Sequence, residues 1–255
     1  MLYFSKPGGA LIHGDCLEEM KRLPDNSVDM ILCDLPYGTT ACKWDTIIPF
    51  EPLWAEYKRI AKKNAAIVLT ASQPFTAALV MSNPKMFRQS LVWEKTRPTN
   101  VFNAKKMFMK WHEDVLVFYT ELPTFTPQMV AGKPATKTQH TQDRSEGHLG
   151  KTGEKDGHFY DNKGLYYPKS VVSIPTEMHT SVHPTQKPVA LFEYLIKTYT
   201  NEGALVLDNC AGSGTTAVAC ENLNRRWCCI EKEQKYCDVI VSRVRRDLSV
   251  VGGSI

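Results

Sequence analysis

The sequence predicts an α/β fold in which a mainly parallel β-sheet is covered by helices on both faces. Short apolar runs of strand length alternate with longer amphipathic segments over most of the chain. The 255 residues, 43% of them apolar, are ample for one such domain with a sizeable core. Two of the apolar runs also end in turns of the kind that hold ligands in open α/β sheets.

Seven apolar runs are expected to be strands, in chain order residues 10–13, 28–34, 65–70, 87–94, 114–119, 204–207 and 226–231. Six segments are expected to be helices, in chain order residues 16–23, 50–63, 74–81, 187–200, 215–223 and 232–248. Proline opens the third of these helices, and proline is well tolerated in a first helical turn. Because strands and helices alternate, most strands should run parallel.

Residues 121–182 differ from the rest of the chain. They are rich in Thr, Lys, Gly, His and Pro, show little apolar periodicity, and are too long for an ordinary connection. Their seven acidic and seven basic residues balance, so the segment is not a simple polycation. Both a disordered insertion and a recognition segment that becomes ordered on its target fit this composition.

The sequence Asp34-Leu35-Pro36-Tyr37 follows the predicted strand 28–34. It places the Asp34 carboxylate, the Leu35 carbonyl and the Tyr37 ring at a carboxyl-terminal strand end, where open α/β sheets bind ligands. Two oxygen acceptors beside an aromatic ring suit a planar ligand with an exocyclic amino group, such as a nucleobase. The alternative is an ordinary strand followed by a turn.

A glycine-rich turn at residues 208–214 follows the strand 204–207 and leads into the helix 215–223. Gly212, Gly214 and Ala217 satisfy the G-x-G-x-x-G/A pattern of dinucleotide sites, and no lysine follows as in triphosphate-binding loops. Glu231 ends the next strand, a position that suits ribose hydroxyls. These features indicate an adenosine-type cofactor, either a nicotinamide dinucleotide or S-adenosylmethionine.

The position of this turn helps to choose between the two cofactors. In a dinucleotide-binding domain the glycine turn comes first and several strands follow it. Only about two dozen residues follow Glu231, and they are expected to form a single helix. The remaining strands must therefore come from upstream, which means that the sheet is entered in a permuted order.

With these motifs in this order, the chain resembles the DNA amino-methyltransferases of the β arrangement, which methylate adenine N6 or cytosine N4. That family has an (Asp/Asn/Ser)-Pro-Pro-Tyr motif, then a target-recognition region, then the Gly-x-Gly turn. The resemblance also includes residues 14–16, Gly-Asp-Cys, and residues 183–188, His-Pro-Thr-Gln-Lys-Pro. Leu35 is a departure, because the family usually has proline there.

The resemblance implies a Rossmann-like, seven-stranded methyltransferase sheet, mostly parallel with one antiparallel strand, in a circularly permuted motif order. Residues 1–120 would form the catalytic half of the domain and 183–255 its S-adenosylmethionine-binding half. Residues 121–182 would be the inserted target-recognition region.

The implied activity is methyl transfer from S-adenosylmethionine to the exocyclic N6 of an adenine flipped out of DNA. Asp34 and the Leu35 carbonyl would accept the amino protons, and Tyr37 would stack on the base. Pro36 biases residue 35 toward an extended backbone, which partly replaces the missing proline. No metal ion is required.

The expected cofactor-binding residues, in chain order, are Asp15, Cys16, Thr185, Lys187, Asp208, Gly212, Ser213, Gly214, Thr215 and Glu231. By resemblance, Glu231 would bind the ribose hydroxyls, Asp208 would face the methionine amino group, and Thr185 and Lys187 would bind the methionine carboxylate. Asp15 is expected either to face the adenine amine or to cap the following helix.

Positive charge is concentrated at residues 85–110, where seven basic residues stand against one acidic residue and aromatic residues are interleaved. This pattern favours a track for DNA phosphates, although a solvated face over core aromatic residues would look similar. The expected DNA-binding residues are Lys95, Arg97, Asn100, Lys105 and Lys106.

Rival functions are N4-cytosine methylation on the same fold, methylation of RNA or protein glutamine, and a non-enzymatic DNA-binding module or a dehydrogenase. Double-stranded DNA is the expected partner, while a homodimer and a cognate restriction endonuclease remain open. The eight cysteines show no C-x-x-C pair and resemble buried thiols of a reducing compartment. With no apolar leader or membrane segment, a bacterial or phage-encoded cytoplasmic protein is expected.

Overall fold

The computed structural model describes residues 1–39, 45–138, 159–176 and 186–250, and these form two compact units. The larger unit comprises residues 1–126 and 170–255, and the smaller comprises residues 127–169. Thr185, one of the expected cofactor ligands, lies outside the described residues. No described helix has both the length and the apolar character needed to cross a membrane.

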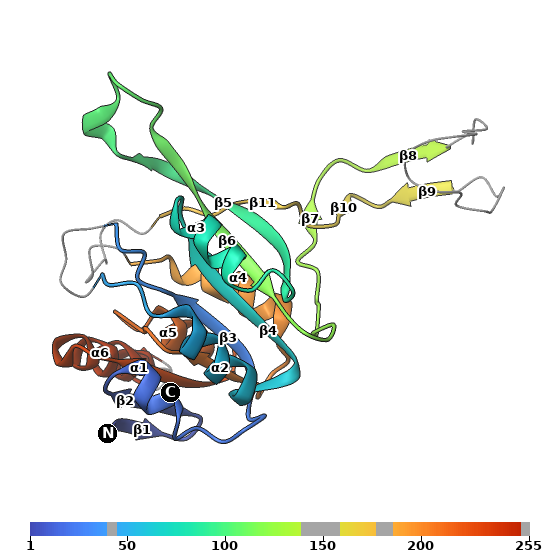
Figure 1. Cartoon of the computed structure of the whole chain (residues 1–255). Coiled ribbons are helices and arrows are strands. Elements are labelled where there is room, and N and C mark those ends of the chain that lie inside the picture. Colours follow the sequence, from blue (N-terminus) through green and yellow to red (C-terminus); the bar gives the residue numbers. More distant parts are fainter. Residues whose placement is uncertain (40–44, 139–158, 177–185, 251–255) are drawn as a thin grey trace. The chain divides into compact units, whose positions relative to one another are not determined.

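The larger unit is built on a mixed sheet, in which nine strands are described (Figure 1). Their order across the sheet is β1 (Leu2–Lys6), β2 (Gly9–His13), β13 (Arg226–Glu231), β12 (Leu205–Asp208), β3 (Val28–Asp34), β4 (Ala61–Ala71), β6 (Lys110–Phe118), β5 (Phe87–Thr99) and β11 (Val171–Ser173). All are parallel except β1 and β6. The mostly parallel α/β sheet predicted from the sequence is confirmed.

The sequence predicted seven strands of this sheet and missed the two edge strands, β1 and β11. Strand β1 is exposed or half-exposed along its length, and its apolar stretch, residues 2–4, is shorter than the runs used to recognise the other strands. Strand β11 has three residues, too few to produce a pattern, and it lies within the region 121–182 that was expected to be an insertion. It pairs with β5 in the main sheet instead.

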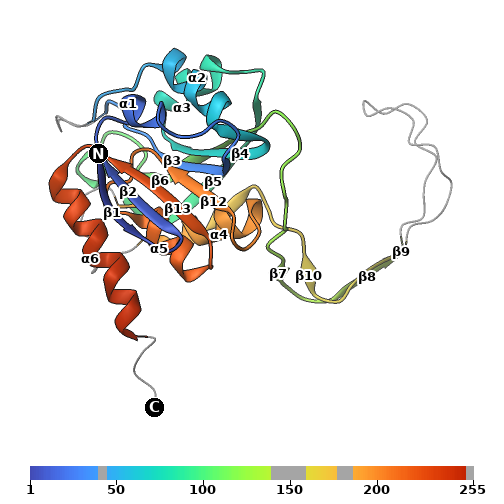
Figure 2. The same ribbon diagram turned by 90° about the horizontal axis from the view of Figure 1, so that it is seen from below.

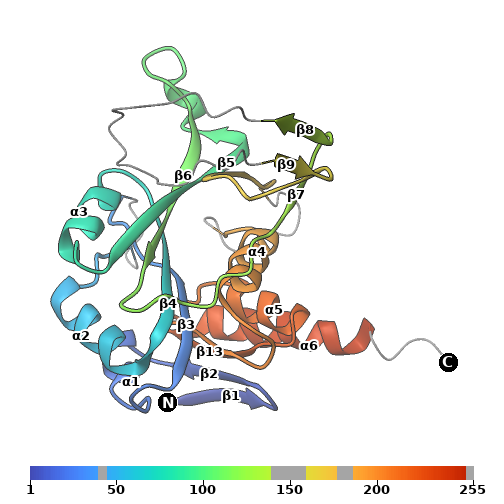
Figure 3. The same ribbon diagram turned by 90° about the vertical axis from the view of Figure 1, so that its right-hand side faces the viewer.

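The described part of the chain contains six α-helices, and they cover both faces of the sheet (Figures 2 and 3). One face carries α1 (Cys16–Met20), α2 (Phe50–Ile60) and α3 (Phe75–Ser82), and the other carries α4 (Val189–Tyr199), α5 (Thr215–Asn222) and α6 (Gln234–Val250). The expected helix 50–63 was too long, because β4 begins at Ala61 directly after α2.

Two hydrophobic clusters form the core, one on each face of the sheet. Strand β3 contributes to both, because successive side chains of a strand point to opposite faces. Met30 and Leu32 belong to the cluster that includes α4 and α5, and Ile31 and Cys33 belong to the cluster that includes α2 and α3. A strand buried on both faces is a continuous apolar run, which is why β3 was recognisable in the sequence.

Two neighbouring strands at the centre of the sheet come from distant parts of the chain. Strand β12 pairs in parallel with β3, with Val206 opposite Met30 and Leu207 opposite Ile31. Because parallel strands end at the same edge of a sheet, Asp34 and Asp208 come to the same edge. This pairing positions the site.

Strands β5 and β6 form a long antiparallel hairpin whose far end extends beyond the sheet (Figures 1 and 3). Trp93 lies opposite Glu113 near the body of the unit, and Thr99 pairs with Lys110 further out. The connection between the strands contains the 3₁₀ helix η1 (Val101–Asn103).

The smaller unit consists of two short antiparallel pairs. Strand β7 (Val130–Ala131) pairs with β10 (Leu165–Tyr166), and β8 (Ala135–Thr138) pairs with β9 (Phe159–Asn162). The Gly132 amide donates to the Gly164 carbonyl at 2.8 Å, and the Tyr166 hydroxyl donates to the Lys133 carbonyl at 2.7 Å. The unit falls inside the segment 121–182 that the sequence set apart.

Candidate active site

A cavity of about 380 Å³ opens at the carboxyl ends of β3 and β12. It is lined by residues 34–37 and by residues 208–213, two segments that are about 170 positions apart in the chain. Of the expected catalytic and cofactor residues, the cavity is lined by Asp15, Cys16, Asp34, Leu35, Pro36, Tyr37, Lys187, Asp208, Gly212, Ser213, Thr215 and Glu231. The two motifs recognised in the sequence therefore share one pocket.

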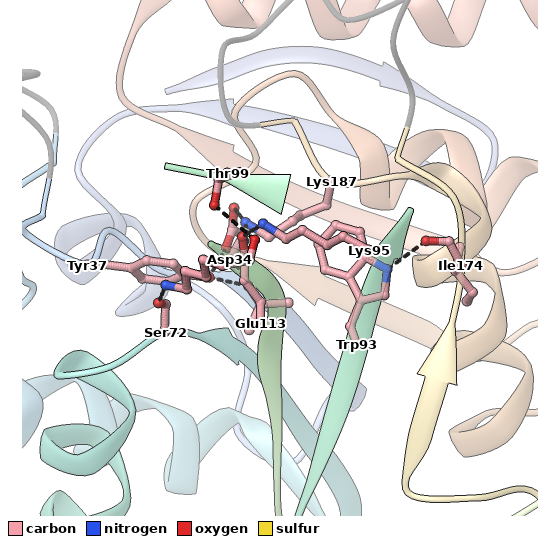
Figure 4. Close-up of polar contacts among 11 residues, drawn as sticks. Asp34, Tyr37, Ser72, Trp93, Lys95, Thr99, Glu113, Ile174 and Lys187 are labelled. Atoms are coloured by element: carbon pink, nitrogen blue, oxygen red, sulfur yellow. Dashed lines mark hydrogen bonds and ion pairs between the residues drawn. The ribbon is translucent and has the colours of Figure 1, made fainter. Parts of the chain in front are cut away.

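The Asp34 carboxylate accepts hydrogen bonds on both of its oxygens. The Tyr37 hydroxyl donates to Oδ1 at 2.8 Å and the Thr70 hydroxyl donates to the same oxygen. The Lys187 ammonium lies 2.6 Å from Oδ2 (Figure 4). The carboxylate is thus held in one orientation at the end of β3 while about a quarter of its side-chain surface stays exposed.

Lys187 belongs to a network of two lysines and two carboxylates (Figure 4), in which Lys95 comes from β5, Glu113 from β6 and Asp34 from the end of β3. Besides Asp34, its ammonium lies 3.3 Å from Glu113 Oε2, and Glu113 Oε1 accepts from Lys95. Burial alone would lower the pKa of Lys187, but Asp34 and Glu113 outweigh it and the pKa is raised. Burial likewise opposes ionisation of Glu113, yet the two lysines keep its pKa below the usual value. Lys187 and Glu113 are therefore both charged at neutral pH.

The Tyr37 ring is fixed by contacts with Phe75 and Lys187. It stacks on Phe75 with ring centroids 5.2 Å apart and an interplanar angle of 25°. The Lys187 ammonium lies 5.4 Å from the centre of the same ring. Burial, together with the nearby Asp34 charge, raises the pKa of the Tyr37 hydroxyl well above its ordinary value, so the hydroxyl remains a donor.

The glycine turn after β12 is tied to Glu231 at the end of β13. The Gly212 amide donates to Glu231 Oε2 at 2.7 Å, and the Glu233 amide donates to Oε1 at 2.7 Å. Gly212 has φ +52°, and a Cβ there would meet no atom within 4 Å, so the backbone faces open space. Glu231 lines the cavity and retains acceptor capacity on each oxygen, because an ionised carboxylate offers about four acceptor sites.

Gly214 has a different function from Gly212 and does not line the cavity. It precedes α5 with φ +78°, and a Cβ at this position would lie 2.7 Å from Cγ1 of Ile240 on α6. The second glycine of the motif is therefore required for the turn and for close packing of two helices. Its expected cofactor contact is not supported by its position.

Asp208 is buried beneath the turn and orders it. Its carboxylate accepts from the Cys210 amide at 3.1 Å and from the Thr216 hydroxyl at 2.5 Å, which links the strand end to the first turn of α5. Burial raises the pKa of this carboxyl to about 6. The Tyr57 hydroxyl of α2 donates to the next residue, Asn209, at 2.6 Å.

Asp15 caps α1, the alternative that the sequence left open. Its Oδ1 accepts from the Leu17 amide at 3.0 Å, and its backbone is extended as an N-cap requires. Its Oδ2 lies 3.8 Å from the Lys232 ammonium. Because Asp15 also lines the cavity, capping and ligand contact are compatible.

The expected DNA-binding residues separate into two groups. Arg97, Asn100, Lys105 and Lys106 are exposed on the β5–β6 hairpin. Lys95 is 6% exposed and is paired with Glu113, so the structure contradicts its placement on a phosphate track. It lies buried at the base of the hairpin, with its ammonium 5.2 Å from the centre of the Trp93 ring.

Sequence reasoning missed Glu113, Thr70 and Tyr57. Each acts through a partner far away in the chain, Glu113 through Lys187, Thr70 through Asp34 and Tyr57 through Asn209. Glu113 stands next to a predicted strand, but nothing in the linear sequence identified its partner. The available signal was a charged residue directly before a predicted apolar strand, together with a lysine at the end of another predicted strand.

The fold, with a ligand cavity at the carboxyl ends of β3 and β12, is that of the α/β methyltransferases. Within this class the chain belongs to the DNA methylase family of N6- and N4-methyltransferases, whose family model matches residues 28–242. Two relatives are 28% identical to it. They are the DNA adenine methyltransferase YhdJ of Escherichia coli (strain K12), over 91% of this chain and 81% of YhdJ, and the type II methyltransferase M.HinfI of Haemophilus influenzae, over 92% of this chain and 68% of M.HinfI.

Solved structures agree on the fold. The M1.HpyAVI–SAM complex superposes with a TM-score of 0.61 at 24% identity, covering 92% of this chain and 99% of that one. The PvuII DNA methyltransferase, described as cytosine-N4-specific, superposes with a TM-score of 0.63 at 15% identity, covering 92% and 86%. The sequence-based assignment to the amino-methyltransferases is confirmed.

Proposed function

We propose that the chain transfers a methyl group from S-adenosylmethionine to the exocyclic N6 of an adenine flipped out of double-stranded DNA. The observation that carries the proposal is the shared cavity, in which the acceptor motif at residues 34–37 lies beside the cofactor turn at residues 208–213. A methyl donor and an amino acceptor bound to these segments would be adjacent. Positioning of this kind supplies a large part of the rate in transfer reactions.

The cavity residues suit the methyl donor. The volume of about 380 Å³ is within the range of small-molecule sites. Glu231 would accept from the ribose hydroxyls, the open backbone at Gly212 would allow close approach, and Asp208 would keep the turn ordered. When bound, the sulfonium supplies an electrophilic methyl group.

The acceptor motif would activate the amine. An exocyclic nitrogen is a poor nucleophile because its lone pair is delocalised into the ring. Hydrogen bonds from its two protons to the Asp34 carboxylate and the Leu35 carbonyl would draw the lone pair back onto nitrogen. As the nitrogen–methyl bond forms, the sulfur–methyl bond would break, S-adenosylhomocysteine would leave, and the amine would lose one proton to solvent by way of Asp34. Tyr37, held on one side by Phe75, would provide a flat surface for the base.

Lys187 would release Asp34 when the amine arrives. Its ammonium occupies Asp34 Oδ2 at 2.6 Å, which is where an amino proton must be accepted, and Glu113 Oε2 lies only 3.3 Å from the same ammonium. A small movement toward Glu113 would free Oδ2 while Lys187 keeps a buried counter-charge. This contact pattern favours a position beside the reacting nitrogen over the methionine carboxylate for Lys187.

Cytosine N4 remains the second candidate for the acceptor. The M.HinfI and M.HpaI methyltransferases and YhdJ match the chain in sequence, and YhdJ is described as an adenine methyltransferase. The structural likeness to the cytosine-N4-specific PvuII enzyme favours the alternative. Aspartate as the first residue of the acceptor motif supports adenine, because the resembled N4 enzymes more often carry serine there.

The variants Asp34→Ala and Asp34→Asn test the proposal. We expect both to abolish methylation, while S-adenosylhomocysteine still raises the melting temperature, because Asp34 faces the acceptor. Asp25→Asn, an exposed aspartate outside the cavity, is the control. Modification-sensitive sequencing of the expressing host and mass analysis of its nucleosides report the activity.

Normal methylation by either Asp34 variant would contradict the role of this carboxylate. If the nucleosides contain N4-methylcytosine in place of N6-methyladenine, the acceptor base is cytosine and the rest of the mechanism stands. An unmodified host chromosome with wild-type protein, together with no methylation of genomic DNA in vitro, would reject the proposed activity.

A further inference from the structure

The far end of the β5–β6 hairpin exposes apolar side chains to an unusual degree. Phe102 is 99% exposed and Phe108 is 100% exposed, so neither ring packs on the described part of the protein. Further large apolar side chains of the same segment, exposed by 38–56%, are Val101, Met107, Met109 and Trp111. Contiguous exposed apolar surface of this kind marks an interaction site.

The tip that carries these rings is internally ordered. The Asn103 amide donates to the Asn100 carbonyl at 3.0 Å, and the Met107 amide donates to the Asn103 carbonyl at 3.0 Å. Asn100 adopts the left-handed region with φ +69°, and its side-chain amide lies 3.0 Å from the Met107 sulfur. The two phenyl rings are therefore presented by a structured turn, which reduces the entropy lost when they bind.

The charge around the rings identifies the partner. Arg97, Lys105 and Lys106 are exposed on the same hairpin, and no acidic residue occurs between Lys95 and His112. A cationic surface with protruding aromatic rings suits a polyanion that has stacked apolar planes inside, which is DNA. An anionic membrane would also attract such a surface, but it offers no reason for the connection with the catalytic residues.

That connection runs through the stem of the hairpin. Lys95 on β5 and Glu113 on β6 pair with each other, and Glu113 contacts Lys187, which contacts Asp34 (Figure 4). Phe108 is five residues from Glu113 and Phe102 is seven residues from Lys95, which at about 3.3 Å per residue limits their backbones to about 17 Å and about 23 Å from the network. The tip is thus held within reach of the base pair whose base would enter the cavity.

We propose that Phe102 and Phe108 form an aromatic wedge that enters the base stack at the flipped nucleotide and replaces the stacking lost there. The inference rests on the proposed function. Flipping costs unstacking and unpairing energy, and an apolar side chain inserted between base steps offsets that cost. Lys105 and Lys106 would bind flanking phosphates and contribute affinity without supplying the stacking.

The test uses the full chain and a duplex of 30 base pairs that contains the motif found methylated in the host chromosome. Phe102→Ala, Phe108→Ala and the double variant are compared with wild type on the paired duplex and on one with a mismatch at the target base. We expect the double variant to lose about tenfold or more in kcat/KM on the paired duplex, because stacking of a base on an aromatic ring is a substantial part of binding. The mismatch weakens the target base pair before the enzyme binds, so the double variant should recover most of the lost kcat/KM on the mismatched duplex.

Three controls distinguish the wedge from other effects. Met81→Ala removes an exposed apolar side chain from α3 and should leave both substrates unaffected. Lys105→Ala with Lys106→Ala should reduce the salt dependence of binding, whereas the phenylalanine variants should not. The response of the melting temperature to S-adenosylhomocysteine should be the same in all variants.

Equal activity of the double variant and wild type on the paired duplex would overturn the inference while the proposed function stands. The inference would also be overturned if the double variant lost the same factor in kcat/KM on both duplexes, or if it sedimented with a different oligomeric state from wild type. Loss of binding to phosphatidylserine vesicles by the double variant, with methylation unchanged, would overturn it as well. If wild type methylates neither duplex nor genomic DNA, the proposed function fails and the wedge fails with it.

Discussion

At the scale of the residue, Glu113 is the clearest example of a side chain that acts through another. It contacts neither the acceptor motif nor the glycine turn, yet it lies 3.3 Å from the ammonium that holds Asp34. We expect Glu113→Gln to lower kcat by about 10- to 100-fold, because Lys187 would then depend on Asp34 alone and would release it less readily. Since Glu113 raises the pKa of Lys187, the alkaline limb of the kcat profile should also move to lower pH.

Steady-state kinetics over pH 6–10, with KM for S-adenosylmethionine unchanged, would measure this effect. Lys95→Met with Glu113→Gln keeps the net charge of the network and controls for the unbalanced lysine. Glu94→Gln, an exposed glutamate on β5, controls for the loss of a carboxylate. A pH profile that does not move would show that Glu113 is structural only.

Asp208 gives a prediction for stability as a function of pH. Burial raises the pKa of its carboxyl from the ordinary 3.8 to about 6. The folded state therefore holds the proton more tightly than the unfolded state, so the stabilisation is fully present below about pH 4 and is lost as pH rises through about 6. Relative to Asp208→Asn, wild type should lose about 2–3 kcal/mol of unfolding free energy between pH 4 and 7.

Urea unfolding of the two proteins across this pH range measures the difference between them. Asn can replace Asp here, since the Thr216 hydroxyl accepts as well as donates. A difference that stays constant, or that grows in favour of wild type with rising pH, would contradict the assignment of the raised pKa to Asp208.

Residue roles were predictable where a motif fixed them and unpredictable where a distant partner did. Asp34, Asp208 and Glu231 end strands, so their common edge followed from the parallel sheet. Lys95 did not follow, because its positive charge suggested phosphate contact until the β5–β6 register placed it near Glu113. Such cross-strand ion pairs depend on register, which single-sequence patterns do not determine.

At the scale of the element, the packing of α5 against α6 gives a further prediction. Gly214→Ala should destabilise the fold by roughly 2–5 kcal/mol, because the backbone has φ +78° and the new Cβ would lie 2.7 Å from Ile240. Gly203→Ala is a matched control, with φ +75° and no atom within 4 Å of the Cβ position. It carries the backbone strain without the clash.

The difference between the two variants in thermal or urea unfolding isolates the clash. If Gly203→Ala and Gly214→Ala cost the same, close packing of the helices is not the reason for the second glycine. Both substitutions lie outside the residues that line the cavity, so the measurement does not depend on a cofactor.

The existence of strands and helices with a clear apolar pattern was predicted well from the sequence. The residues at which they begin and end were predicted less well. The seven interior strands and six helices all occur, because most of them bury an apolar run or stripe that is visible in the sequence. The end of α2 was misplaced because residues 61–63 continue its polar pattern while their backbone already belongs to β4. Pairing with β3 decides that boundary, and pairing is a tertiary effect.

At the scale of the whole molecule, the permuted order determines how the site is assembled. The acceptor motif comes from the N-terminal part of the chain and the cofactor turn from the C-terminal part, yet their strands are neighbours in the sheet. The family match at residues 28–242 spans both parts. This common edge was predictable from the order of the motifs, whereas the hairpin that extends from β5 and β6 was not, because its apolar tip has no periodic pattern.

The position of β12 and β13 between β2 and β3 has a consequence for synthesis on the ribosome. Until residues 205–231 emerge, the nascent sheet lacks two adjacent interior strands, and β2 and β3 each present an unsatisfied edge. Such edges invite pairing with other chains. We therefore expect translation stalled before residue 204 to yield a species that recruits chaperones, and emergence of residues 205–231 to close the gap in the sheet.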